Sequence, residues 1–111
     1  MTPEGRVKRS IRSFLGKLPK VWVMVKDQGA YSVRGLPDIV CSIDGMFLAL
    51  EVKAPGKKAR KLQQFHLNAI SNAGGASACV ESVDDVRFAI DMLGKSHILP
   101  LSRGTKKGES L

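Results

Sequence analysis

Two acids and a lysine in the first half of the chain have the residue types of a site for a divalent cation. Asp38 follows the segment Gly35-Leu36-Pro37, and Glu51 and Lys53 stand at the end of the next apolar run. Hard cations such as Mg²⁺ bind one or two carboxylates together with water and phosphate oxygens. The three side chains therefore indicate a candidate site for Mg²⁺ or Mn²⁺.

The segment between the two acids is predicted to be a β-hairpin that brings them together. Asp44-Gly45 between two apolar runs is typical of a type I′ turn, which needs positive φ at both central positions. With that turn, Asp38 falls opposite Glu51, and Lys53 shares their face because strand side chains alternate. Like charges opposed on a sheet are destabilising, so a cation between them would explain the pair. Solvated charges at an exposed strand end remain the alternative for either acid alone.

The other elements are predicted from hydrophobic periodicity and from helix start and stop signals. Val21–Val25 is apolar throughout and is predicted to be a strand buried on both faces. The expected order is a helix over 2–16, strands over 21–25, 36–43 and 46–53, a helix over 59–73, a strand over 76–80 and a helix over 82–93. In the 59–73 helix the predicted inward stripe is Leu62, Phe65, His66, Ala69, Ile70 and Ala73.

Two side chains on separate helices are candidates to join the acids. Glu4 lies on the inward stripe of the first helix, whereas Lys8, Arg9 and Arg12 are predicted to point elsewhere. A favourable interaction with the helix dipole is the alternative explanation for Glu4. Gln63 falls at the edge of the inward stripe of the second helix, and it is the candidate for positioning water or phosphate.

The charge distribution predicts a nucleic-acid partner. The formal net charge is +8, and basic segments flank the acidic pair. Such a surface attracts a phosphate polymer, because neutralising phosphates releases counterions. A solvated basic face is the alternative for each basic run, and a non-catalytic basic DNA-binding module is the alternative for the whole protein. The candidate DNA-binding residues are Lys8, Arg9, Arg12, Ser32, Arg34, Lys57, Lys58, Arg60 and Lys61.

Length and composition are those of one small domain. We expect this domain to cover residues 1–95, followed by a basic, flexible tail over 96–111. The sequence has neither a signal-peptide pattern nor an apolar run of membrane-spanning length, so we expect a soluble, cytoplasmic protein. Cys41 and Cys79 lie in apolar runs and are predicted to be buried, reduced thiols. His66 is predicted to be a core residue rather than a base.

Taken together, these motifs resemble the PD-(D/E)XK nuclease superfamily, and most closely its virus-type replication-repair nuclease (VRR-NUC) family. The resemblance lies in Gly35-Leu36-Pro37-Asp38, in Leu50-Glu51-Val52-Lys53, and in Leu62-Gln63 with Gly74-Gly75 closing the helix. It implies an α/β fold with a restriction-endonuclease-like core of order α-β-β-β-α-β-α and a mixed central sheet flanked by helices.

The resemblance also implies an activity. It predicts a homodimeric, Mg²⁺- or Mn²⁺-dependent endonuclease that hydrolyses phosphodiester bonds in branched DNA such as Holliday junctions, in a phage-infected or bacterial cell. Asp38, Glu51 and the carbonyl of Val52 are the candidate metal ligands. The candidate catalytic residues are Glu4, Asp38, Glu51, Lys53 and Gln63.

Overall fold

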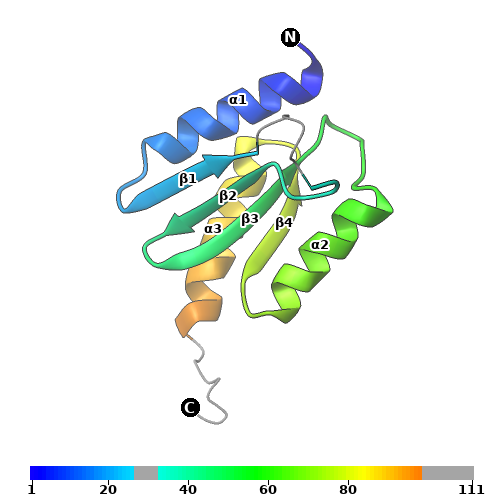
Figure 1. The fold of residues 1–111 in the computed structure, drawn as a ribbon. Coiled ribbons are helices and arrows are strands. Elements are labelled where there is room, and N and C mark those ends of the chain that lie inside the picture. The colour runs from blue at the N-terminus through cyan, green and yellow to red at the C-terminus, as the bar shows by residue number, and fades with distance from the viewer. Residues whose placement is uncertain (27–32, 99–111) are drawn as a thin grey trace.

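The order of helices and strands is the predicted one. A computed structural model describes residues 1–26 and 33–98, with side chains up to residue 93. Its elements are α1 (Pro3–Gly16), β1 (Val21–Val25), β2 (Ile39–Ile43), β3 (Met46–Val52), α2 (Lys61–Asn72), β4 (Ala76–Val80) and α3 (Val83–Ile98) (Figure 1). The second strand begins after Pro37, which has no N–H for the ladder, and α3 extends beyond the predicted end at Leu93.

The four strands form one mixed sheet in the order β1-β2-β3-β4. β1, β2 and β3 are successively antiparallel, and β4 is parallel to β3. Ile43 pairs with Met46, and Asp44 and Gly45 between them have φ values of 51° and 84°. Positive φ at both positions is the signature of a type I′ turn, so the predicted hairpin and its register are confirmed.

α1 and α3 cover one face of the sheet and form the main core with it. The N-terminus of α1 is capped by Thr2, whose hydroxyl accepts a hydrogen bond from the N–H of Gly5 at 3.0 Å. The inward residues of the two helices pack against the alternate strand residues that face them. The fully buried core includes Ile11, Leu15, Ile39, Cys41, Leu48, Leu50, Val52, Val80 and Val86.

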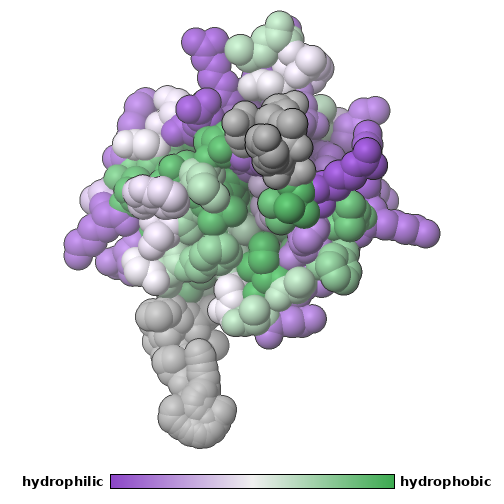
Figure 2. Space-filling view, in the orientation of Figure 1, coloured by the Kyte–Doolittle hydropathy of each residue, from purple (hydrophilic) through white to green (hydrophobic). Residues whose placement is uncertain are grey.

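α2 covers only part of the opposite face. It lies against β3 and β4, where the hydroxyl of Ser77 donates to the carbonyl of Leu67 at 2.8 Å. β1 is the edge strand on the uncovered side, and Trp22 and Met24 are 63% and 51% exposed. The prediction that β1 is buried on both faces is therefore wrong, because none of the three described helices covers its second face. Figure 2 shows the apolar residues that this leaves at the surface over the strands.

The inward face of α2 also differs from the prediction. Leu67 is the buried residue of this helix, while Leu62 and Phe65 are exposed. The helix is rotated so that its contact line follows Leu67 and the half-buried Ile70. Cys79, predicted to be buried, is exposed, because it points to the face that α2 covers incompletely.

Three further predictions are not tested by the residues that the structure describes. Ser32 lies outside the described residues, as does the tail from residue 99. The domain boundary at residue 95 stays a prediction.

Within the described residues, none of the helices has the length and apolar content needed to cross a membrane.

Candidate active site

The two acids meet at one end of the sheet, as the hairpin register requires. Ile39 pairs with Leu50, so the next position along each strand places Asp38 beside Glu51. Both side chains are buried, with exposures of 5% and 1%. Asp38 Oδ2 accepts a hydrogen bond from the N–H of Val52 at 2.8 Å, which fixes the carboxylate against the end of β3.

Lys53 lies in the same buried cluster. Its Nζ is 3.5 Å from Oε2 of Glu51, and its side chain is 9% exposed. Among the described residues, Oε1 of Glu51 is buried without a hydrogen-bond partner. Burial first, and then the neighbouring Asp38, raise the pKa of Glu51 to about 7, although the positive charges of Lys53 and Lys26 oppose the shift. The unpaired Oε1 of the buried Glu51 can therefore accept a further positively charged ligand.

Two lysines that the sequence did not assign to this cluster lie beside the acids. Lys8 Nζ is 3.3 Å from Oδ1 of Asp38, with only 21% of the Lys8 side chain exposed. The prediction that Lys8 points away from the inward stripe of its helix is wrong. Lys26, at the end of β1, donates from Nζ to the carbonyl of Leu36 at 3.1 Å, and its N–H donates to the carbonyl of Asp38 at 2.7 Å.

The donor set fits a hard divalent cation bound with few protein ligands. Two buried carboxylates face each other across the strand pair, and Glu51 Oε1 has no partner within the described residues. No group of three or more His, Cys, Asp or Glu that could hold a metal gathers anywhere in the part of the chain that the structure covers. Zinc-type sites use such groups, whereas Mg²⁺ takes one or two carboxylates and completes its shell with water and phosphate.

The architecture that carries these residues is found in solved structures. One structure titled "VRR_NUC domain" superposes with a TM-score of 0.68 at 24% identity, covering 82% of this chain and 97% of that chain. Another, titled "VRR_NUC domain protein", gives a TM-score of 0.65 at 15% identity, covering 83% and 88% of the two chains. The chain has the VRR-NUC fold. No protein-family model and no curated protein matches its sequence.

In this VRR-NUC fold, the other two candidate catalytic residues, Glu4 and Gln63, are less closely associated with Asp38 and Glu51. Glu4 is half-buried near the start of α1. Oε1 of Gln63 accepts a hydrogen bond from the N–H of Arg60 at 2.8 Å and so caps its own helix. Among the described residues, no hydrogen bond or ion pair joins either side chain to Asp38 or Glu51. Their roles stay predictions.

The segment before Asp38 is held against the start of α2. Gly35 has a φ of 79°, and a Cβ there would lie 2.6 Å from Cγ of Leu62. Glycine is therefore required both for the backbone conformation and for the close approach. This contact places the first turn of α2 next to the segment that leads through Asp38 into β2, so the basic run entering α2 lies near the acid pair.

The remaining described basic candidates are at the surface. α1 and α2 bring their N-terminal ends toward the same end of the sheet (Figure 1). Exposed side chains there can reach a phosphate backbone without any desolvation of a buried charge. The exposed candidates are Arg9, Arg12, Arg34, Lys57, Lys58, Arg60 and Lys61.

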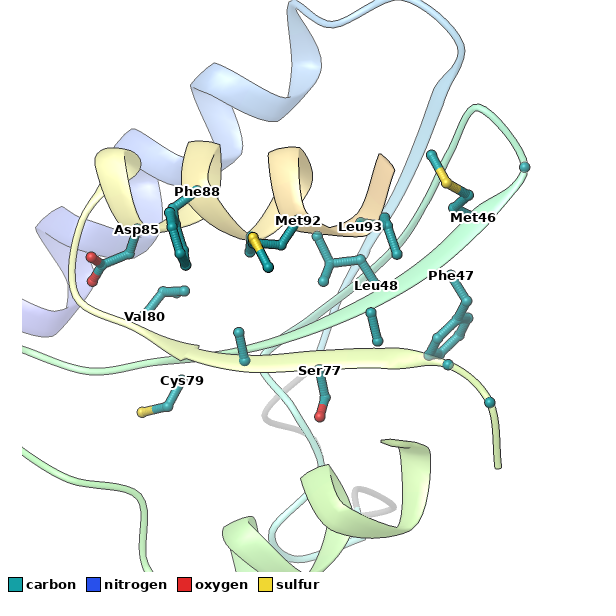
Figure 3. Close-up of a pocket in the computed structure, with 16 residues that line it drawn as sticks. Met46, Phe47, Leu48, Ser77, Cys79, Val80, Asp85, Phe88, Met92 and Leu93 are labelled. Atoms are coloured by element: carbon teal, nitrogen blue, oxygen red, sulfur yellow. The ribbon is translucent and has the colours of Figure 1, made fainter. Parts of the chain in front are cut away.

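A separate groove of about 840 Å³ lies along β4 beside α3. Figure 3 shows Phe88, Met92 and Leu93 of α3 facing β4, with Met46 and Phe47 at one end. Among the residues whose side chains the structure describes, Asp85 is the only charged one in its lining. The described lining has neither lysine nor arginine, although the chain has a net charge of +8, so this lining is not suited to phosphate. It is therefore distinct from the candidate active site in both position and chemistry.

Proposed function

We propose that the protein is a metal-dependent DNA endonuclease that hydrolyses phosphodiester bonds, with selectivity for branched DNA such as four-way junctions. The observation that carries the proposal is the pair of buried, opposed acids Asp38 and Glu51, accompanied by Lys53. The VRR-NUC fold supports the proposal, because these three residues lie on the architecture that the VRR_NUC domain structures share. The substrate is DNA in the cytoplasm of a bacterial or phage-infected cell.

The acids are the proposed ligands of Mg²⁺ or Mn²⁺, together with the carbonyl of Val52. A divalent cation there would generate a nucleophilic hydroxide near neutral pH and stabilise charge on the leaving oxygen. The N–H of Val52 orients the carboxylate of Asp38, and Lys53 neutralises Glu51 and holds its Oε2. Glu4 and Gln63 are proposed to position water at the edge of this cluster.

The exposed basic residues are proposed to bind the arms of the DNA. Arg9 and Arg12 lie on α1, and the run Lys57–Lys61 leads into the first residue of α2, so the two groups can contact different phosphate segments. Contacts of this kind position a duplex without reading its sequence. Arg34 and Ser32 complete the proposed set, whereas Lys8, predicted as a further member, is largely buried against Asp38.

A cleavage assay tests the proposed function. The protein is incubated with labelled linear duplex, flap and four-way junction, each in Mg²⁺, Mn²⁺ or EDTA. We expect cutting of the junction in either metal and none in EDTA, with the linear duplex cut more slowly. If none of the three substrates is cut in a metal-dependent way, the proposal is wrong.

Symmetric cleavage of a four-way junction needs two active sites, so we propose a two-fold homodimer. The groove along β4 is the proposed contact surface. β4 is an outer strand of the described sheet, and an edge of this kind can pair with an identical edge. Phe88 and Met92 beside it are 67% and 44% exposed. The described lining of the groove also has no positive charge that would repel a second basic copy.

Replacing Phe88 with glutamate should convert the dimer to a monomer, because the pairing would bury a charge in both copies. Light scattering coupled to size exclusion measures the mass. Phe65→Glu is the matched control, since Phe65 is 63% exposed on α2 and does not line the groove. A wild-type protein that is monomeric at working concentration and still cuts the junction fully would contradict the dimer.

A further inference from the structure

Lys8 lies at the edge of the inward face of α1, next to residues of the core. It lies four residues after Glu4 and three before Ile11, whose side chain is fully buried. A lysine is rarely buried unless its charge is paired. Its Nζ reaches out of this helix to Oδ1 of Asp38, at 3.3 Å, across the space between α1 and the end of the sheet.

The two acids are held in different ways. Asp38 has both oxygens engaged, since Oδ2 accepts the N–H of Val52 at 2.8 Å and Oδ1 faces Lys8. Glu51 has one oxygen paired with Lys53 at 3.5 Å, whereas its Oε1 is without a partner in the described chain. A cation can therefore reach Glu51 without disturbing Lys53. To reach Oδ1 of Asp38 it must displace an ammonium group.

From this asymmetry we infer that Lys8 is a positioning residue that competes with the divalent cation for Asp38 and thereby sets the metal affinity of the site. The inference rests on the proposed function, in which Asp38 and Glu51 bind the metal. In the metal-free protein, Lys8 neutralises Asp38 and keeps two opposed carboxylates compatible with burial. Metal binding breaks that ion pair, because an ammonium and a divalent cation on one carboxylate oxygen repel each other.

The test measures metal binding directly, without DNA or cleavage. Isothermal titration calorimetry with Mn²⁺ gives the Kd of the wild type and of Lys8→Ala, and Lys8→Gln is a second variant that keeps the length of the side chain. We expect both variants to bind Mn²⁺ roughly five- to tenfold more tightly than the wild type, as loss of a partly buried competing ion pair predicts. Lys8→Arg should restore the wild-type Kd, since it keeps the charge.

The matched control is Lys20→Ala, which removes an exposed ion pair with Asp44 outside the site and should leave the Kd unchanged. Thermal unfolding in EDTA accompanies the titrations. If Lys8→Ala and Lys8→Gln melt earlier but bind Mn²⁺ with an unchanged or weaker Kd, Lys8 is only a structural partner of Asp38 and the inference is wrong. If the wild type binds no divalent cation at all, the proposed metal site fails instead.

Discussion

Replacing Asp38 with asparagine should reduce cleavage of branched DNA by at least about 1,000-fold. Asparagine keeps the size of the side chain and an oxygen that can accept the N–H of Val52, so the end of β3 should remain in place. What is lost is the negative charge that would bind the metal together with Glu51. The rate is measured in single-turnover assays with a labelled four-way junction in Mg²⁺.

Binding of DNA should change little in the same variant. The exposed basic residues on α1 and before α2 carry the phosphate contacts, and none of them depends on the charge of Asp38. The Kd for the junction, measured in EDTA, should stay within about twofold of the wild type. Asp44→Asn is the control, because this acid lies at the exposed hairpin turn and forms only a surface ion pair.

The outcome separates the nuclease from a non-catalytic DNA-binding module. A binding module predicts that Asp38→Asn and Asp44→Asn behave alike, because neither acid would take part in its function. Loss of cleavage with retained binding is expected only for a catalytic site. Equal cleavage by the two variants would remove Asp38 from the proposed mechanism.

The hairpin was predictable because its geometry is local. A two-residue turn fixes the register of the strands that it joins, so the identities of Asp44 and Gly45 sufficed to place Asp38 opposite Glu51. Alternation along the strand then placed Lys53 on the same face. No information from distant parts of the chain was needed for these three residues.

Lys26 could not be placed from the sequence in the same way. The observed register pairs Val25 with Ile39, which brings Lys26 next to Asp38. The connection between these strands is long, however, and a long loop does not fix which residues face one another. The basic end of β1 could therefore be assigned to the acid cluster only from the structure.

The buried position of Lys8 could not be predicted from the sequence for a different reason. Helical spacing puts Lys8 outside the stripe of Val7, Ile11, Phe14 and Leu15 and predicts an outward orientation, whereas the structure turns its side chain inward. A buried lysine depends on a partner from another element, and that partner, Asp38, lies far along the chain.

The apolar residues of β1 and α2 could not be placed from the sequence either. Their types do not reveal which half of the sheet a helix will cover, so Trp22 and Phe65 were wrongly expected to be buried.

The stability of the metal-free protein should fall as the pH rises from about 5 to 8, and Glu51 should be the cause. Its pKa is raised from 4.5 to about 7 in the folded protein, first by burial and then by Asp38. The folded state therefore binds a proton more tightly than the unfolded state. The stabilisation is present in full below the unfolded pKa and is lost as the pH rises through the folded one.

Glu51→Gln isolates this contribution, because glutamine resembles the protonated acid and does not titrate. Between pH 5 and 8 in EDTA, the wild type should lose up to about 3 kcal/mol of unfolding free energy relative to Glu51→Gln. Urea unfolding at each pH measures the difference. Asp84→Asn, which alters a side chain that is 95% exposed, should follow the wild type.

Equal pH dependence of the wild type and Glu51→Gln would mean that Glu51 is already ionised in the folded protein. In that case the positive charges of Lys53 and Lys26, which oppose the upward shift, would outweigh burial and Asp38. A difference of the expected sign would instead show that the acid pair is stable at high pH only when additional positive charge is supplied. A divalent cation between Asp38 and Glu51 would supply that charge, so adding Mn²⁺ at pH 8 should restore much of the lost stability in the wild type and much less in Glu51→Gln.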